Sequence, residues 1–297
     1  MDHGTTPLTD AESLMSFACE DWSAWQAVLA AQRSRLDARW AFEQAWAMLE
    51  TDDLFDGWCP LCEKRVRFAA TQSTTPGHSM LRESLVCPGC STNARMRAGM
   101  ALLVALAPSP DAQVYITEQA SPSFVWLQKR YRNAHGSEYG ADPELTRGLR
   151  QYLHDLGGAG EIRAEDVTKL TFADASLDAI GSFDVLEHVP DYRAALREFA
   201  RPLKPGGSLV LTAPLLHLAE ASVERARVNA DGSVEHLLPP EFHGDPLSGD
   251  GILCFHHFGW DLTDHARAAG FRRARMVMPW SPHLGLSANL WTLVAER

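Results

Sequence analysis

Long apolar runs are missing from this sequence of 297 residues. No segment reaches the about 20 consecutive apolar residues that a membrane-spanning helix needs. The first residues also lack the basic and then apolar order of a signal peptide. We therefore expect a cytoplasmic protein with no membrane partner.

Basic charge is scarce as well. The 38 acidic side chains outnumber the 27 basic ones and give a formal net charge of -11, which repels a phosphate backbone. With 45% apolar and 22% charged residues, the composition excludes disordered and fibrous classes. We expect a globular protein that acts on a small-molecule substrate, and the charge disfavours nucleic acid as a partner.

Four of the six cysteines form two identical pairs, Cys59-Pro-Leu-Cys62 and Cys87-Pro-Gly-Cys90. Each pair brings two sulfur atoms to one point, and two pairs supply the four thiolates of a tetrahedral zinc site. Two disulfides are the alternative, which a reducing cytoplasm disfavours. Four thiolates leave no open position on the metal, so the predicted Zn2+ is structural. His78 lies between the pairs and could replace one ligand.

The region before the cysteines is helical in pattern. Residues 21–50 contain neither glycine nor proline and repeat apolar residues at helical spacing, which predicts one long helix or a helical pair. Its aromatic face could pack inside the chain or against a second copy, so a homodimer stays open. We divide the chain into an N-terminal helical segment (1–56), a zinc-binding module with a connecting helix (57–108), and a larger domain (109–297).

The larger domain alternates short apolar segments with helical ones, which is typical of an α/β fold with a parallel sheet and helices on both faces. Asp191 is placed to cap a helix that ends near Leu203. Residues 215–257 interrupt the alternation and are predicted to be an insertion over the carboxyl edge of the sheet, where such folds bind ligands. The predicted strands are 113–118, 133–139, 161–166, 177–186, 206–214, 271–278 and 288–295.

The first three of these strands end in acidic residues. Glu118 ends the first, Glu138 the second, and Glu165 and Asp166 the third. A carboxylate after the second strand can accept both hydroxyls of a ribose, and one after the third can accept from the exocyclic amine of adenine. Acids at all three places suit a nucleoside without phosphates and would repel a pyrophosphate.

Residues 170–214, LTFADASLDAIGSFDVLEHVPDYRAALREFARPLKPGGSLVLTAP, resemble the central block of class I S-adenosylmethionine-dependent methyltransferases, of the type 11-like group. The resemblance implies a Rossmann-like, seven-stranded methyltransferase sheet and S-adenosyl-L-methionine as cofactor. The residues that match the pattern of that family are Asp166, Leu170, Phe172, Asp174, Ser176, Asp178 and Lys204 to Gly207.

The resemblance also assigns roles to single residues. It implies that Glu138 holds the ribose, that Asp166 and the backbone of Val167 bind the adenine, and that Phe183 and Asp184 border the methionine end. Tyr139 could reach the cofactor, although strand alternation favours packing for it. The candidate cofactor-binding residues are Glu118, Gln119, Ala120, Ser121, Glu138, Tyr139, Glu165, Asp166, Val167, Phe183 and Asp184.

The loop after the first strand departs from the family pattern. Family members carry a glycine-rich loop there, whereas this chain has Glu118-Gln119-Ala120-Ser121-Pro122. Ser121 can cap a helix and Pro122 suits its first turn, so the loop could still present a helix N-terminus to the methionine carboxylate. A relative that has lost cofactor binding is the alternative.

Methyl transfer needs alignment and, for a protonated acceptor, a base. His188 follows the fourth strand, and the insertion adds His236 and His243, which gives three candidate catalytic residues. The insertion is dense in histidines and carboxylates from Glu235 to His257, which suggests a polar substrate pocket or a second metal site.

Three functions compete. The first is a methyltransferase that acts on an oxygen or nitrogen atom of a small molecule. The second is a ribosomal RNA methyltransferase whose zinc module holds the nucleic acid, supported by the arginines around the cysteines and opposed by the net charge. The third is a non-catalytic scaffold stabilised by zinc. The arginines in question are Arg65, Arg67, Arg82, Arg95 and Arg97.

Overall fold

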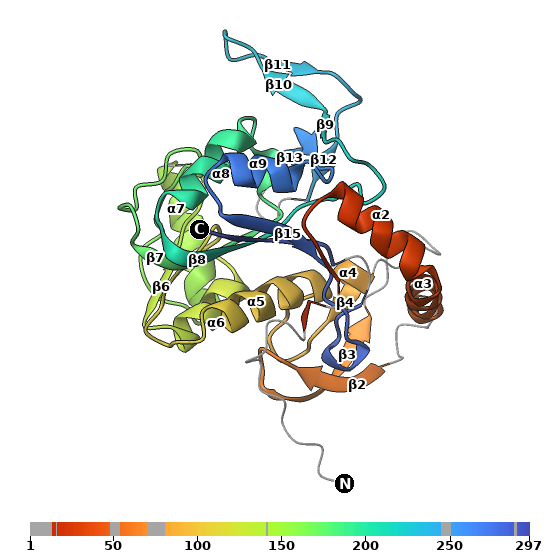
Figure 1. Cartoon of the computed structure of the whole chain (residues 1–297). Helices are drawn as coiled ribbons and strands as arrows, with labels where there is room; N and C mark the ends of the chain where they lie inside the picture. The colour runs from red at the N-terminus through yellow and green to blue at the C-terminus, as the bar shows by residue number, and fades with distance from the viewer. Residues whose placement is uncertain are drawn as a thin grey trace.

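The computed structural model describes residues 14–15, 17–47, 54–70, 81–140, 142–244, 251–287 and 290–297. A seven-stranded sheet with the order β1-β15-β16-β8-β7-β5-β6 runs through its centre (Figure 1). The β6-β5-β7-β8 half is parallel, and β16 is antiparallel to both β8 and β15. The strands are β1 (Ala18–Cys19), β5 (Gln113–Ile116), β6 (Asn133–Gly136), β7 (Leu177–Phe183), β8 (Leu203–Thr212), β15 (Arg273–Val277) and β16 (Thr292–Glu296). The predicted Rossmann-like α/β fold is confirmed.

One predicted strand does not form, because a side chain hydrogen-bonds to its backbone. Residues 161–166 form only an isolated parallel bridge to Glu138. The amide of Gln119 occupies the neighbouring backbone groups: its nitrogen donates to the carbonyl of Glu161 at 2.8 Å, and its oxygen accepts from the N–H of Arg163 at 2.8 Å. These backbone groups are therefore not available for a longer ladder. The seventh strand is instead β1 from the N-terminal segment, which pairs with β15.

Helices cover both faces of the sheet (Figure 1). Side chains alternate between the two cores because successive strand residues point to opposite faces. Val114 packs in one core, and the neighbouring Tyr115 packs in the other. The first core takes α5 (Ala94–Leu106), α6 (Pro122–Arg130) and α7 (Pro143–Asp155), and the second takes α2 (Trp22–Ala31), α8 (Tyr192–Ala200) and α9 (Leu262–Ala268). Within the part of the chain that the structure describes, no helix combines the length and the apolar character that crossing a membrane requires.

The predicted helical segment at 21–50 is a pair, α2 and α3 (Arg33–Ala47), separated at Gln32. After it comes a small antiparallel sheet of β2 (Leu54–Cys59), β3 (Lys64–Ala70) and β4 (Leu85–Val86), with α4 (Leu81–Ser84) beside it. This sheet begins inside the predicted N-terminal segment. The connecting helix α5 packs on β7 and β8, so the module and the large domain share one core.

The described residues of the insertion at 215–257 form three small two-stranded sheets. They are built from β9 (Val223–Glu224) with β14 (His256–His257), β10 (Ala226–Val228) with β11 (Val234–His236), and β12 (Phe242–His243) with β13 (Ile252–Leu253). The β10–β11 hairpin projects from the body of the molecule (Figure 1). The strand pairs β9–β14 and β12–β13 bring His243, His256 and His257 back toward the end of β7, which the short helix η1 (Leu186–His188) follows.

Candidate functional site

The acid after β6 holds the loop that follows β5. One carboxylate oxygen of Glu138 accepts from the backbone N–H groups of Gln119 at 2.8 Å and of Ala120 at 2.6 Å. The close approach depends on Gly136, because a Cβ there would lie 2.7 Å from the ring of Phe124 and 2.8 Å from the carbonyl of Glu118. A glycine at the end of β6 therefore allows a tight loop although the loop itself has none.

The loop then starts α6 as its sequence predicts. Ser121 is the N-cap, its hydroxyl accepts from the N–H of Phe124 at 3.1 Å, and Pro122 occupies the first turn. The same hydroxyl donates to Glu118 at 2.9 Å. Burial raises the pKa of Glu118, although the bonds from Ser121 and Ser123 and the nearby Arg95 lower it. Glu118 is thus held inside the loop.

Of the residues that follow the bridge at Ala164, Glu165 is buried and Asp166 is exposed. The carboxylate of Glu165 accepts from Arg163 at 2.6 Å and from the N–H of Thr171 at 2.9 Å, so it is fully engaged in the protein. Asp166 is exposed, with one oxygen bonded to Thr168 at 2.8 Å, and Val167 packs against the second core.

Tyr139 does not pack in the protein, contrary to the strand-alternation expectation. Its side chain is 80% exposed because it lies beyond the last residue of β6, on the rim of the sheet. It therefore stands next to Glu138 with an uncovered aromatic ring. Tyr115, by contrast, is fully buried, and its hydroxyl bonds to Ser137 at 2.7 Å.

The last residue of β7 and the residue that follows it point to different places. Phe183 is 5% exposed and packs inward, since a Cβ on Gly99 of α5 would lie 2.5 Å from its ring. Asp184 has a φ of 51° and pairs with two arginines, with Arg82 at 3.1 Å and with Arg95 at 2.9 Å. A left-handed backbone is unusual outside glycine, and here it turns the carboxylate toward the cysteine module.

Two of the three candidate catalytic histidines are brought together. His188 and His243 make an edge-to-face contact with ring centroids 4.9 Å apart. Both rings border Glu187, whose side chain is completely buried. His236 does not join them, because it lies on β11 of the projecting hairpin with its side chain exposed to solvent. Asp245, within the acidic and histidine-rich part of the insertion, lies outside the described residues, and so does His78.

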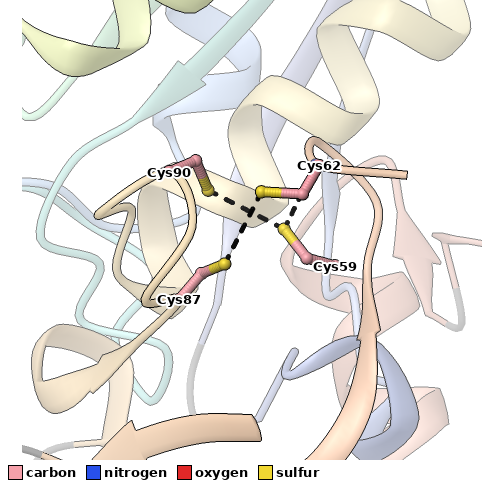
Figure 2. A group of neighbouring side chains, drawn as sticks. All are labelled: Cys59, Cys62, Cys87 and Cys90. Carbon is pink, nitrogen blue, oxygen red and sulfur yellow. Dashed lines mark hydrogen bonds between the residues drawn. The ribbon is translucent and has the colours of Figure 1, made fainter. Parts of the chain in front are cut away.

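The four paired cysteines meet in space (Figure 2). Cys59 and Cys90 have their sulfurs 3.7 Å apart, Cys62 and Cys87 3.8 Å apart, and all four sulfurs lie within 4.8 Å of one another. These distances are far too long for the disulfide alternative, whose sulfurs are about 2.0 Å apart. Zinc–sulfur bonds of about 2.3 Å in a tetrahedron place sulfurs about 3.8 Å apart, so the group fits zinc.

The backbone around the cysteines supports the same geometry. The N–H of Cys62 points at the sulfur of Cys59 at 3.4 Å, and the N–H of Gly89 points at the sulfur of Cys87 at 3.4 Å. Hydrogen bonds from the neighbouring thiols lower the pKa of Cys87, whereas burial raises the pKa of Cys62 to about 12. A shared cation is the ordinary way to hold several such sulfurs as thiolates.

Three of the five arginines around the cysteines face inward, whereas Arg65 and Arg67 are exposed. Arg97 is completely buried, donates to the carbonyls of Thr92 at 2.7 Å and of Leu284 at 3.2 Å, and lies under the ring of Phe68. Burial lowers the pKa of Arg97, and the four cysteines counteract that effect. Together with the Arg82 and Arg95 pairs to Asp184, these contacts remove three of the five arginines from the surface that RNA binding would use.

A cleft of about 420 Å³ opens beside the carboxyl edge, between the N-terminal helix pair and the segments that follow β8 and β15. Four indole rings line it together with leucine side chains and with charged side chains of α3. The indole nitrogens of Trp280 and Trp291 are buried and have no hydrogen-bond partner among the described residues. The lining includes Trp25, Trp40, His217, Met278, Trp280 and Trp291.

Comparison with known proteins identifies the central part of this architecture. Residues 123–211 match a protein family described as a methyltransferase domain. This central segment is therefore similar to a methyltransferase domain. The match spans the segment from α6 to β8, which contains the acids after β6 and β7.

Curated proteins that are similar to part of this chain are named as O-methyltransferases. A ubiquinone biosynthesis O-methyltransferase from Xanthomonas axonopodis pv. citri is 36% identical over 102 residues, and one from Xanthomonas oryzae pv. oryzae is 38% identical over 104. Each match covers 34% of this chain and 41% of the relative, so the chain spans about two fifths of their length. A crystal structure of an S-adenosylmethionine-dependent methyltransferase from Mesorhizobium loti matches with a TM-score of 0.43 and 18% identity, over 70% of this chain and 100% of that one.

Sequence reasoning missed three arginines with defined roles. Arg82 and Arg95 pair with Asp184, yet nothing local distinguishes them from Arg65, which also lies near the cysteines. Arg201 holds the turn before β7 through the carbonyls of Leu170 and Phe172, both at 2.7 Å. The available signal for Arg201 was its place at the end of a capped helix, which fixes its direction only once the turn is known.

Proposed function

We propose that this protein transfers the methyl group of S-adenosylmethionine to an oxygen or nitrogen atom of a small-molecule acceptor. The observation that carries the proposal is the set of acids at the carboxyl ends of β6 and β7, Glu138 and Asp184, inside a matched methyltransferase domain. The names of the curated relatives favour oxygen as the acceptor atom.

Each part of the cofactor has residues of suitable chemistry. Glu138 would hold the ribose, and the uncovered ring of Tyr139 would lie against the adenine. The exposed Asp166 would accept from the adenine amine. At the methionine end, Asp184 would hold the amino group and Arg95 the carboxylate, in the manner of the ion pairs they now make with each other. The bound cofactor supplies an activated methyl group on a sulfonium.

The acceptor would occupy the indole-lined cleft. The apolar part of the cleft lining favours a planar, apolar molecule. Methyl transfer then requires that the acceptor and the sulfonium be aligned and that water be excluded. The helix pair α2 and α3 closes one side of this cleft, which gives the N-terminal segment a direct part in acceptor selection.

We also propose that the four cysteines bind a structural Zn2+. Four thiolates complete a tetrahedral zinc and leave no position for a reactant. The metal would fix the turns that carry the cysteines. Arg82 lies before the second cysteine pair and Arg95 after it, so the metal would position both arginines at Asp184. Location in the cytoplasm and assembly as a homodimer remain predictions of the sequence.

Calorimetric titration with S-adenosylmethionine and S-adenosylhomocysteine tests the proposal. We expect micromolar binding to the zinc-loaded protein, weakened at least tenfold in Glu138→Ala and in Asp166→Ala. Glu161→Ala is a matched control, since Glu161 is an exposed acid on the same rim that pairs with Arg150 at 3.0 Å. Absence of binding to folded wild-type protein would refute the enzyme and favour the zinc-stabilised scaffold.

A further inference from the structure

The buried carboxylate of Glu187 lacks the partners that a buried charge requires. Its side chain has no exposed surface, and neither oxygen has a hydrogen-bond partner among the described residues. An ionised carboxylate in this position is strongly unfavourable unless a cation or a donor compensates it. Ring nitrogens of His243 at 3.6 Å and of His188 at 3.8 Å lie beside it, both beyond hydrogen-bond distance.

One ring nitrogen of each histidine faces this carboxylate. Nδ1 of His188 lies 2.8 Å from the carbonyl oxygen of Leu253, which can only accept, so Nδ1 carries the proton. Nε2 of His243 lies 3.1 Å from a carboxylate oxygen of Glu241, so Nε2 is the donor there. In the neutral rings, the remaining nitrogens, Nε2 of His188 and Nδ1 of His243, are then unprotonated and face Glu187. Two lone pairs and a carboxylate that converge without a cation repel one another.

The outer contacts also match those of metal-binding histidines. Such a histidine usually donates its second ring N–H to a carbonyl or a carboxylate, which fixes the ring and its tautomer. Glu241 is itself held in place by His257 at 3.0 Å and by Arg225 at 3.1 Å. The carboxylate that orients His243 is thus anchored by two further side chains, and the carbonyl that orients His188 belongs to β13.

We propose that Glu187, His188 and His243 bind a divalent transition-metal ion. Their ligand atoms lie within 4.8 Å of one another, which suits bonds of about 2.0 to 2.2 Å to one centre. Two imidazoles and one carboxylate favour zinc, manganese, iron or cobalt over magnesium and calcium, and three protein ligands leave positions open for an exogenous oxygen. The site joins η1 at the end of β7 to β12 of the insertion.

If the proposed methyl transfer holds, the metal has a direct use. An acceptor hydroxyl bound at an open position would have a lowered pKa, as water bound to zinc does. The hydroxyl proton would pass to solvent, the oxygen would form its bond to the methyl carbon, and S-adenosylhomocysteine would leave as that carbon–sulfur bond breaks. This use rests on the proposed function, whereas the metal site itself does not.

Metal titration of the whole protein, without cofactor or acceptor, tests the site. The protein is dialysed against a chelator until elemental analysis finds one zinc per chain, and Mn2+ is then added while its free electron paramagnetic resonance signal is followed. We expect one Mn2+ bound per chain, because manganese prefers nitrogen and oxygen ligands to thiolates. Co2+ serves as a second probe and should give visible bands without the sulfur-to-metal band of a thiolate site.

The variants separate the site from general effects. Glu187→Gln should weaken Mn2+ and Co2+ binding by more than about tenfold, and His243→Asn, at a half-buried position, should do the same. His236→Asn, in the same insertion but exposed on β11, should bind like the wild type. Failure of both metals to bind wild-type protein, or unchanged binding in Glu187→Gln and His243→Asn, would overturn the site. A wild type that binds metal but not S-adenosylmethionine would overturn only the proposed function.

Discussion

Arg95 of α5 and Asp184 at the end of β7 form an ion pair with 2.9 Å between nitrogen and oxygen. Their side chains are only 15% and 19% exposed, so the pair is largely shielded from water. Burial by itself would lower the pKa of Arg95, but the nearby charges of Asp184, Glu83 and Glu118 outweigh it, and that pKa is raised. The pair couples the cysteine module to the strand end at which the methionine part of the cofactor would bind.

Arg95→Met should lower the free energy of unfolding by about 1 to 3 kcal/mol, because the substitution leaves Asp184 with Arg82 alone in a shielded position. Urea titration measures the change. Arg150→Met is the matched control: Arg150 pairs with Glu161 on the surface, and its loss should cost less than about 1 kcal/mol. An equal loss of unfolding free energy in the two variants would contradict a larger contribution from Arg95 than from Arg150.

Cys62→Ala should abolish the bound zinc, since three thiolates hold the metal far less tightly than four. It should also weaken S-adenosylmethionine binding, because Arg82 and Arg95 flank the second cysteine pair. Elemental analysis and calorimetry measure the two effects. Cys19→Ala, at a buried cysteine of β1 away from the group, should retain one zinc per chain. Full zinc content in Cys62→Ala would argue against the four-cysteine site.

The carboxylate of Asp178 makes the stability of the fold depend on pH. Burial alone would raise the pKa of Asp178, but hydrogen bonds from Lys204 at 2.8 Å and from the N–H of Gln113 at 2.7 Å outweigh it, and the pKa is lowered. A lowered folded-state pKa stabilises the fold above the unfolded-state pKa of about 4, and that stability is lost as pH falls through the folded value.

Asp178→Asn should therefore be less stable than the wild type at neutral pH, and the difference should shrink as the pH falls below about 4. Urea titrations across this range measure it. Asp37→Asn, which removes an exposed helix pair with Arg33, is the control and should change stability little at any pH. A difference for Asp178→Asn that stays constant with pH would show that the carboxylate charge is not the cause.

Two glycine substitutions should have opposite effects. Gly99→Ala would place a Cβ 2.5 Å from the buried ring of Phe183, and overpacking of this kind costs about 1 to 3 kcal/mol. Gly148 lies within α7, and a methyl group added there would meet no atom within 4 Å, so Gly148→Ala should stabilise by about 0.5 to 1 kcal/mol through helix propensity. Thermal unfolding of both variants checks the pair, and a destabilised Gly148→Ala would contradict the placement of α7.

Several local predictions were confirmed because their causes are local. Ser121 and Asp191 cap α6 and α8 as expected, since a cap depends on residues three positions apart. The boundary of strand β8 was predicted less accurately. The strand predicted from residue 206 begins at Leu203, and its first residues are irregular because the ladder shifts register against β7.

The candidate site was predictable in part. The acids that follow the strands were found from the alternation of elements, which places successive strand ends at one edge of the sheet. Their hydrogen-bond partners were not predictable. The carboxylate of Glu165 is bonded to Arg163 and Thr171, and the side chain of Gln119 bonds to backbone groups that a strand ladder would use. Such competition between side chain and backbone depends on which groups reach each other after folding.

By itself, the sequence determined the α/β alternation, the helix caps and the two cysteine pairs, because periodicity and short spacing act within a few residues. Only the tertiary structure decided that Arg95 faces Asp184, and that Glu187 meets a histidine of the distant strand β12. Those contacts join elements far apart in the chain. The free energy of each contact depends on burial and on the direction of each side chain. Both are set only when the sheet, the cysteine module and the insertion pack together.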